Sequence, residues 1–210
     1  MTTVEFHFDF GSPNAYLSHL VIPGIETRTL AAFTYVPVLL GGIFKLTNNV
    51  SPVTANQGIR NKGEYQELEM HRFLRAHAIT AFRPNPYFPV NTLQIMRAAI
   101  VAEYEGYLKA YVNAVFGHMW AEPKKMDEPE IIEAALDRSG FDGAHILART
   151  QEPAIKARLM ENTEKSVARG AFGSPTFFVG DEIFFGKDRL VEVEAAIRDG
   201  GAALPLAGPA

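Results

Sequence analysis

The stretch VEFHFDFGSPNAY, residues 4–16, joins an alternating segment to the expected start of a helix. Apolar and polar side chains alternate from Val4 to Phe10, and this period of two residues predicts a strand with one face more buried than the other. Serine is a favoured N-cap residue and proline is favoured in the first helical turn, so we expect a helix to begin at Ser12. The rest of the fold is predicted outward from this corner between a strand and a helix.

The residues that follow are expected to complete a strand–helix–strand unit and then a loop. We expect Pro23-Gly24 to end or break the first helix. Residues 33–40 are predicted to form a second strand, in which Pro37 suits an edge position or a strand end. A strand, a helix and a strand in this order predict a parallel, right-handed unit. Gly41-Gly42 is expected to break the chain before a loop-like segment at 43–60.

The remainder of the chain is predicted to hold a helical block and then a hairpin. Strand signals return at 176–179, and the turn Gly180-Asp181 leads into a returning strand at 183–185. Asp188 is expected to cap a last helix. The helices expected between the two strand regions are a long one at 91–118 and shorter ones near 61–79, 129–139 and 151–169.

This order of elements predicts an α/β protein: β-α-β, a helical block, and then β-β-α. It is the order of a thioredoxin-like fold with an inserted all-helical domain. Residues 1–44 and 165–199 would form the discontinuous thioredoxin-like domain, and residues 45–164 would form the helical insertion domain. Residues 200–210 are expected to be a flexible C-terminal tail.

The amino-acid composition limits the classes of binding partner that we expect. The chain has 210 residues, of which 47% are hydrophobic, and 20 Lys and Arg against 24 Asp and Glu give a net charge of -4. Without a basic block we expect no nucleic-acid partner. Without an apolar run of about 20 residues we expect no membrane span. The first residues lack the basic start and apolar core of a signal peptide, so a cytoplasmic location is expected.

The absence of cysteine limits the chemistry further. It excludes disulfides, thiolate-ligated zinc, iron–sulfur clusters and a nucleophilic cysteine. The six histidines show no metal-binding spacing, so no metal site is expected. A phosphate loop, a dinucleotide fingerprint and a nucleophile elbow are also absent from the sequence. Any thiol chemistry therefore needs a borrowed thiol.

Two motifs point to one candidate site. Gly11-Ser12-Pro13-Asn14 lies where a strand end meets a helix N-terminus, a place where ligands gather and the helix dipole favours an anion. Two interpretations of Ser12 stay open: a helix cap only, or a hydroxyl that hydrogen-bonds a bound thiolate. In residues 170–176 we expect Pro175 to be cis and to lie beside this corner, with the preceding backbone open to an extended peptide. A plain turn before a strand is the alternative.

Other polar side chains offer further contacts. Asp188 is expected either to cap the last helix or to receive a ligand ammonium, and Arg189 either to be solvated or to receive a carboxylate. Asn91 suits an N-cap before the long helix and would also face a cleft. One polar helix face is either solvated, with ion pairs along the helix, or the wall of a cleft for an acidic substrate; it consists of Lys62, Tyr65, Glu69 and Arg72.

Several motifs together resemble the 2-hydroxychromene-2-carboxylate isomerases and the kappa-class glutathione transferases, of the DsbA-like branch of the thioredoxin superfamily. The resemblance covers about residues 4–199. Ser174 stands where relatives more often have Ala or Leu, Glu69 where they often have Asp, and residues 51–60 match poorly. The motifs are FDFGSP at 8–13, GIFK at 42–45, FPVNTL at 88–93, MR at 96–97, GAFGSPTFFV at 170–179 and GKDR at 186–189.

The resemblance implies roles for individual residues. Ser12 would be the catalytic residue, which activates glutathione. Ser174 would bind the tripeptide through its backbone, and the γ-glutamyl end would be held by Asp188 and Arg189. The substrate would be contacted by Lys45, Tyr87 and Asn91. The full glutathione-binding set would be Ser12, Asn14, Asn49, Lys62, Ser174, Pro175, Asp188 and Arg189.

The function that the resemblance implies is glutathione-dependent cis–trans isomerisation of an aromatic conjugated α-keto acid, in the breakdown of aromatic compounds. Glutathione would be a cofactor, and the protein would be a homodimer. A kappa-like transferase that joins glutathione to an electrophile is the alternative on the same site. A non-catalytic module that binds glutathione or a peptide is the alternative outside the enzymes.

Overall fold

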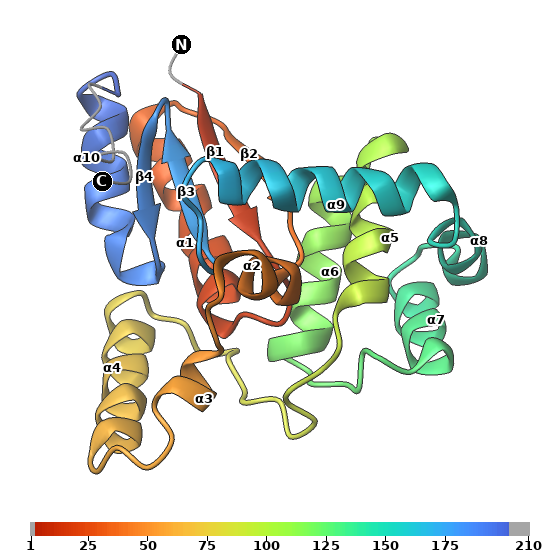
Figure 1. Cartoon of the computed structure of the whole chain (residues 1–210), viewed down its shortest axis with the longest axis horizontal. Helices are drawn as coiled ribbons and strands as arrows, with labels where there is room; N and C mark the ends of the chain where they lie inside the picture. The colour runs from red at the N-terminus through yellow and green to blue at the C-terminus, as the bar shows by residue number, and fades with distance from the viewer. Residues whose placement is uncertain (1–2, 202–210) are drawn as a thin grey trace.

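The computed structural model describes residues 3–201 and shows a mixed sheet flanked by helices (Figure 1). Within those residues the sheet has four strands in the order β2-β1-β3-β4. β1 (Val4–Phe8) runs parallel to β2 (Phe33–Pro37), so the expected parallel unit is confirmed. β3 (Thr176–Val179) is antiparallel to β1 and to β4 (Glu182–Phe185), which confirms the hairpin. The α/β, thioredoxin-like order of elements is as expected.

Helices connect and follow the strands. α1 (Pro13–Thr29) joins β1 to β2, and η1 (Lys187–Arg189) with α10 (Leu190–Arg198) follows β4. The helices between β2 and β3 are α2 (Leu40–Thr47), α3 (Pro52–Ala55), α4 (Lys62–Ala76), α5 (Leu93–Tyr104), α6 (Leu108–Trp120), α7 (Pro129–Arg138), α8 (Gly143–Arg149) and α9 (Pro153–Ala168).

The expected domain limits do not coincide with the ends of these helices. The limits at 44/45 and 164/165 fall inside α2 and α9, and the division into two domains stays a prediction. From residue 202 onward, the tail expected at 200–210 lies outside the described residues. In the part of the chain that is described, no helix has both the length and the apolar character needed to cross a bilayer.

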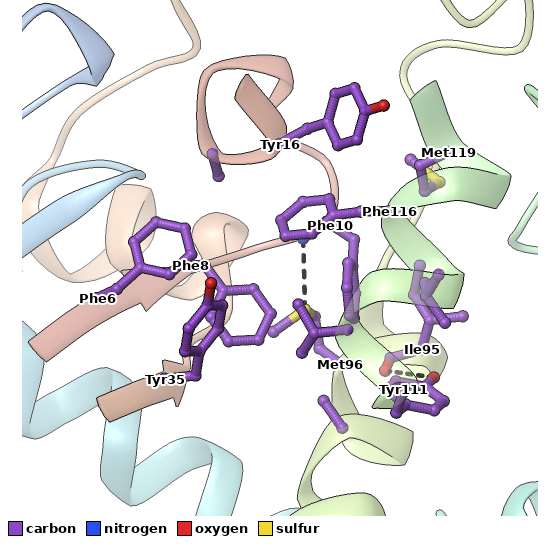
Figure 2. Packing of buried hydrophobic residues seen from close by; sticks show 14 of the residues in the cluster. Phe6, Phe8, Phe10, Tyr16, Tyr35, Ile95, Met96, Tyr111, Phe116 and Met119 are labelled. Atoms are coloured by element: carbon purple, nitrogen blue, oxygen red, sulfur yellow. Dashed lines mark hydrogen bonds between the residues drawn. The ribbon is translucent and has the colours of Figure 1, made fainter. Parts of the chain in front are cut away.

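The two faces of β1 meet different helices, which explains the alternating sequence. On one face the Phe8 ring lies 5.8 Å from the Phe116 ring of α6, measured between centroids. On the other face His7 Nδ1 lies 2.9 Å from Ser166 Oγ of α9. Because both faces of β1 are covered, this strand is buried, and the corner between β1 and α1 lies next to the core. Figure 2 shows the first of these faces, with Phe6, Phe8, Phe10, Tyr16, Tyr35 and Phe116 packed together.

The prediction that Pro23-Gly24 ends the first helix was wrong, because α1 continues through both residues to Thr29. A proline inside a helix costs about 3 kcal/mol, since a backbone hydrogen bond is lost. Ile22 and Ile25, on either side, are fully buried in the core. Burial of two such side chains is worth roughly 3–6 kcal/mol, which offsets the cost.

The prediction of a loop after Gly41-Gly42 was also wrong, because α2 and α3 occupy this segment. Tertiary contacts start α2: the Leu40 N–H donates to Asp9 Oδ2 at 2.7 Å. A Cβ at Gly42 would lie 3.1 Å from Thr163 Cγ2, so the glycine lets α2 lie close against α9. Glycine here serves helix packing and does not break the chain.

The single long helix expected at 91–118 is two helices, α5 and α6. Gly106 has a positive φ of 82°, a conformation that favours glycine, and it separates them. The Tyr107 N–H then donates to the Ala102 oxygen at 2.9 Å, which satisfies a carbonyl group at the end of α5. The apolar spacing continues across the break, so the periodicity alone did not reveal it.

Asp188 does not cap the last helix. It lies inside η1, and its carboxylate pairs with Lys187 Nζ. Gly186 takes the N-cap position of η1 and Arg189 that of α10, neither with a side-chain hydrogen bond to the helix.

Candidate active site

Ser12 closes the corner between β1 and α1 and contacts a segment far away in the sequence. As expected, it is the N-cap of α1, and its Oγ accepts from the Ala15 N–H at 3.2 Å. The same hydroxyl donates to the backbone oxygen of Ser174 at 2.9 Å. Only 5% of Ser12 is exposed. The hydroxyl therefore caps the helix and at the same time is directed at the loop before β3.

The loop before β3 holds the corner from the other side. The Ser174–Pro175 bond is cis, as expected, and Ser174 Oγ accepts from the Asp9 N–H at 3.1 Å. The Pro175 oxygen accepts from the Gly186 N–H at 3.0 Å, which ties this loop to the turn that opens η1. The bond between Phe88 and Pro89 is also cis, which is not among the expectations from the sequence.

Asp9 joins three segments at this corner and was missed as a site residue. Its fully buried carboxylate accepts from the Gly11 N–H at 2.8 Å, the Leu40 N–H at 2.7 Å and the Thr92 hydroxyl at 2.7 Å. Burial raises the pKa of Asp9, and these hydrogen bonds oppose the rise. A signal was present: an acidic residue stands between two phenylalanines, directly before the Gly-Ser-Pro corner.

A cavity of about 400 Å³ opens at the corner. Its polar lining includes Ser12 and Ser174, and in the described part of the chain no charged side chain lines it. Trp120 Nε1 donates to the Phe10 oxygen at 2.8 Å, which fixes the indole in the wall. Such a wall suits an aromatic ligand with a polar group at one end. The aromatic lining, which was not predicted from the sequence, consists of Phe44, Phe82, Phe88, Trp120, Phe172 and Phe185.

Four of the expected site residues come together in this cavity: Ser12, Asn14, Asn49 and Ser174. Asn49 Nδ2 donates to the Phe172 oxygen at 2.9 Å, which joins the end of α2 to the loop before β3. The Asn14 side chain makes no hydrogen bond with any described residue, so its amide is free to meet a ligand.

Other expected residues do not line this cavity. Pro175 is buried behind Ser174, and Lys62 is exposed at the start of α4. Lys45 lies on the opposite face of α2 and lines a second cavity. Tyr87 is exposed, and its neighbour Phe88 lines the wall instead.

Asn91 and the charged residues of η1 have partners of their own. Asn91 is exposed, and its Oδ1 accepts from the Leu93 N–H at 3.1 Å, while Thr92 takes the N-cap position of α5. Asp188 pairs with Lys187, and Arg189 Nη1 lies 2.7 Å from Glu192 Oε1. η1 begins two residues after Phe185, which lines the cavity, so both charges lie on a turn that continues from its wall.

The fold and the corner define a class: a thioredoxin-like protein in which a serine stands at the first strand–helix corner and cysteine is absent. Comparison with known proteins agrees. The family model described as "DSBA-like thioredoxin domain" matches residues 3–198. The chain therefore belongs to the DsbA-like thioredoxin-domain family.

Its similar relatives include two kinds of enzyme. The 2-hydroxychromene-2-carboxylate isomerase of Pseudomonas putida is 30% identical over 92% of this chain and 93% of the relative. Human glutathione S-transferase kappa 1 is 26% identical over 90% of this chain and 87% of the relative. A solved structure of a 2-hydroxychromene-2-carboxylate isomerase matches with a TM-score of 0.78 and 27% identity, over 93% of this chain and 94% of that one.

Proposed function

We propose that this protein is a glutathione-dependent cis–trans isomerase of an aromatic conjugated α-keto acid, with glutathione as a cofactor that is regenerated. One observation carries the proposal. The Ser12 hydroxyl lies 2.9 Å from the Ser174 oxygen, at the first turn of α1 and in an aromatic cavity, in a chain without cysteine. The relatives named as isomerases support the same reaction class.

The groups around Ser12 suit a thiol-bearing peptide. In the first turn of α1, Pro13 has no N–H and the Ala15 N–H is bonded to Ser12, so the Asn14 N–H is left to meet a ligand, and the helix dipole favours a negative charge beside it. A thiol in such a position has a lowered pKa, so its thiolate is more abundant at neutral pH. The rest of the peptide would be held near the cavity wall by Asn14, Asn49 and the Ser174 backbone.

The charged residues that would bind the γ-glutamyl end of glutathione lie outside the aromatic wall of the Ser12 cavity. Asp188 and Arg189 would receive its ammonium and carboxylate, by exchanging their present ion pairs for the ligand. The Gly186–Pro175 hydrogen bond supports this assignment, because it ties the turn that carries both residues to the loop beside Ser12.

When bound, glutathione supplies a thiolate whose addition to the conjugated double bond makes that bond single, so that it rotates before the thiolate leaves. The Ser12 hydroxyl turns from the Ser174 oxygen to donate its proton in a hydrogen bond to the sulfur. The aromatic wall holds the ring of the substrate and keeps water from it. The thiolate that adds to the double bond is released again at the end, so the reaction consumes no glutathione.

We expect isomerisation of 2-hydroxychromene-2-carboxylate to require glutathione and to depend on Ser12. Ser12→Ala removes the hydroxyl, and the loss of one preorganised donor lowers kcat/KM by about 100-fold or more. Ser18→Ala is the matched control, because it removes a buried hydroxyl from the same helix outside the cavity wall. Product formation followed by absorbance, with and without glutathione, measures both effects.

Four outcomes would overturn the proposal or a part of it. Full activity without glutathione would end the proposed mechanism. An unaffected Ser12→Ala would return Ser12 to a capping role only. A stoichiometric loss of free thiol during turnover would favour a transferase, the activity for which the human relative is named. Glutathione binding without turnover on any conjugated acid would favour a binding module.

A further inference from the structure

The two faces of α2 border different cavities. Leu40 and Phe44 face the Ser12 cavity. Gly42, Lys45 and Leu46, about half a helical turn away, face a second cavity of about 660 Å³. α9 contacts both α2 and α5, and most residues that line this second cavity belong to these three helices. We call this second cavity the α2–α9 groove, lined by Leu39, Gly42, Lys45, Leu46, Leu93, Arg97, Pro153, Lys156, Ala157, Leu159, Met160, Thr163 and Glu164.

The groove combines an apolar floor with a cationic rim. The more buried apolar lining residues, Leu39, Leu93 and Leu159, form the floor, and one acidic residue, Glu164, also lines the groove. Three cations, Lys45, Arg97 and Lys156, come from three different helices. The chain as a whole carries a net charge of -4, so an excess of basic residues does not explain their convergence.

These cations are unpaired, unlike other cations of α9. Among the described residues, none of Lys45, Arg97 and Lys156 forms an ion pair or a side-chain hydrogen bond. Arg158 and Lys165, on the same helix as Lys156, both pair with Glu161. Three cations that share a groove with a single acidic residue, Glu164, raise the local positive potential, which attracts an anion.

We propose that the α2–α9 groove binds a small amphipathic carboxylate, separately from the Ser12 cavity. Its apolar body would lie on the floor around Leu93 and Leu159, and its carboxylate would lie among Lys45, Arg97 and Lys156. Charge complementarity selects this class of ligand: a neutral apolar molecule would leave the cations unpaired, and an inorganic anion would leave the floor uncovered. The site is independent of the proposed isomerase activity.

The test uses 2-naphthoate as the probe and 2-naphthalenemethanol as its uncharged counterpart, titrated into the ¹⁵N-labelled full chain. We expect 2-naphthoate to shift the amide resonances of residues 42–46 and 156–160. We expect the alcohol to bind these residues at least about tenfold more weakly, since it lacks the charge. The chain has one tryptophan, so the indole N–H resonance of Trp120 reports separately on the Ser12 cavity.

A variant pair tests the cations themselves. Arg97→Met with Lys156→Met keeps a flexible, unbranched side chain at each position and removes two charges, and we expect it to weaken 2-naphthoate binding at residues 42–46 by about tenfold or more. Lys165→Met is the matched control, a cation of α9 outside the groove, and it should leave the affinity unchanged. Thermal unfolding confirms that the variants are folded. Equal affinity for the acid and the alcohol, an unaffected double variant, or shifts confined to Trp120 and its cavity would overturn the proposal.

Discussion

His19 is a residue whose burial makes stability depend on pH. It lies on α1, and its Nδ1 is 2.9 Å from the Tyr35 hydroxyl of β2. Burial lowers the pKa of His19 from 6.5 to about 4. Between these two values the unfolded chain binds a proton that the folded chain does not, so stability falls as the pH falls from 6.5 toward 4. Above pH 6.5 the contribution of His19 is fully present.

This contribution can be isolated with His19→Gln. A fall in pKa from 6.5 to about 4 corresponds to roughly 3 kcal/mol of pH-dependent stability. Urea unfolding of the wild type at pH 7.5 and 4.5 should therefore show a loss that is about 2–3 kcal/mol larger than in the variant. The pKa of His7 is also lowered by burial, but His7 is present in both proteins and cancels in the comparison. Equal losses in the two proteins would show that His19 is protonated in the fold.

At the scale of elements, the contact between α2 and α9 depends on one glycine of a pair. An added Cβ at Gly42 would lie 3.1 Å from Thr163 Cγ2, whereas one at Gly41 would meet no atom within 4 Å. Thr163 cannot move aside freely, because its hydroxyl donates to the Leu159 oxygen and accepts from the Leu39 N–H. Both glycines lie in a helix, where alanine is favoured by about 1 kcal/mol.

We therefore expect opposite effects from two identical substitutions. Gly41→Ala should stabilise the protein by about 0.5–1 kcal/mol in urea unfolding. Gly42→Ala should destabilise it by about 1–3 kcal/mol, because the crowding outweighs the gain in helix propensity. If Gly42→Ala stabilised the protein as much as Gly41→Ala, the close approach of α2 to α9 would have no energetic role.

At the scale of the whole molecule, one segment, residues 50–68, carries five exposed apolar side chains, which we call the 50–68 patch. This segment includes α3 and the start of α4, which Figure 1 shows at one corner of the molecule, away from the sheet, and no residue of α4 is buried. Tyr65 and Leu68 of α4 are 55% and 45% exposed. Such a patch is typical of a protein–protein interface. Its other exposed apolar residues are Val50, Val53 and Ile59.

We propose that this patch is covered in a homodimer, the assembly that the family resemblance implies. Leu68→Glu places a charge in the patch and should convert a dimer to a monomer, as measured by size-exclusion chromatography with light scattering. Val191→Glu is the control, since Val191 on α10 is 78% exposed and lies outside the patch. A monomeric wild type, or a dimer that survives Leu68→Glu, would contradict the proposal.

Local signals in the sequence predicted much of this molecule. The alternation of residues 4–10, the Ser12-Pro13 start of a helix and the hairpin around Gly180-Asp181 each depend on a few neighbouring residues. β1, α1, β3 and β4 were therefore predictable, and so was the cis bond before Pro175 once the motif was recognised. The absence of cysteine, with a serine at the corner, was likewise readable from the chain alone.

Tertiary structure alone decided which side chains meet. Asp9 accepts from Thr92, 83 positions away, and the Leu39 N–H donates to Thr163, 124 positions away. Lys45 is the last residue of the GIFK motif, yet its position on α2 directs it to the α2–α9 groove and not to Ser12. Periodicity and capping act within about one helical turn, and hence they mark where elements begin and which face is apolar. The partners of that face depend on packing between distant segments, which no local pattern encodes.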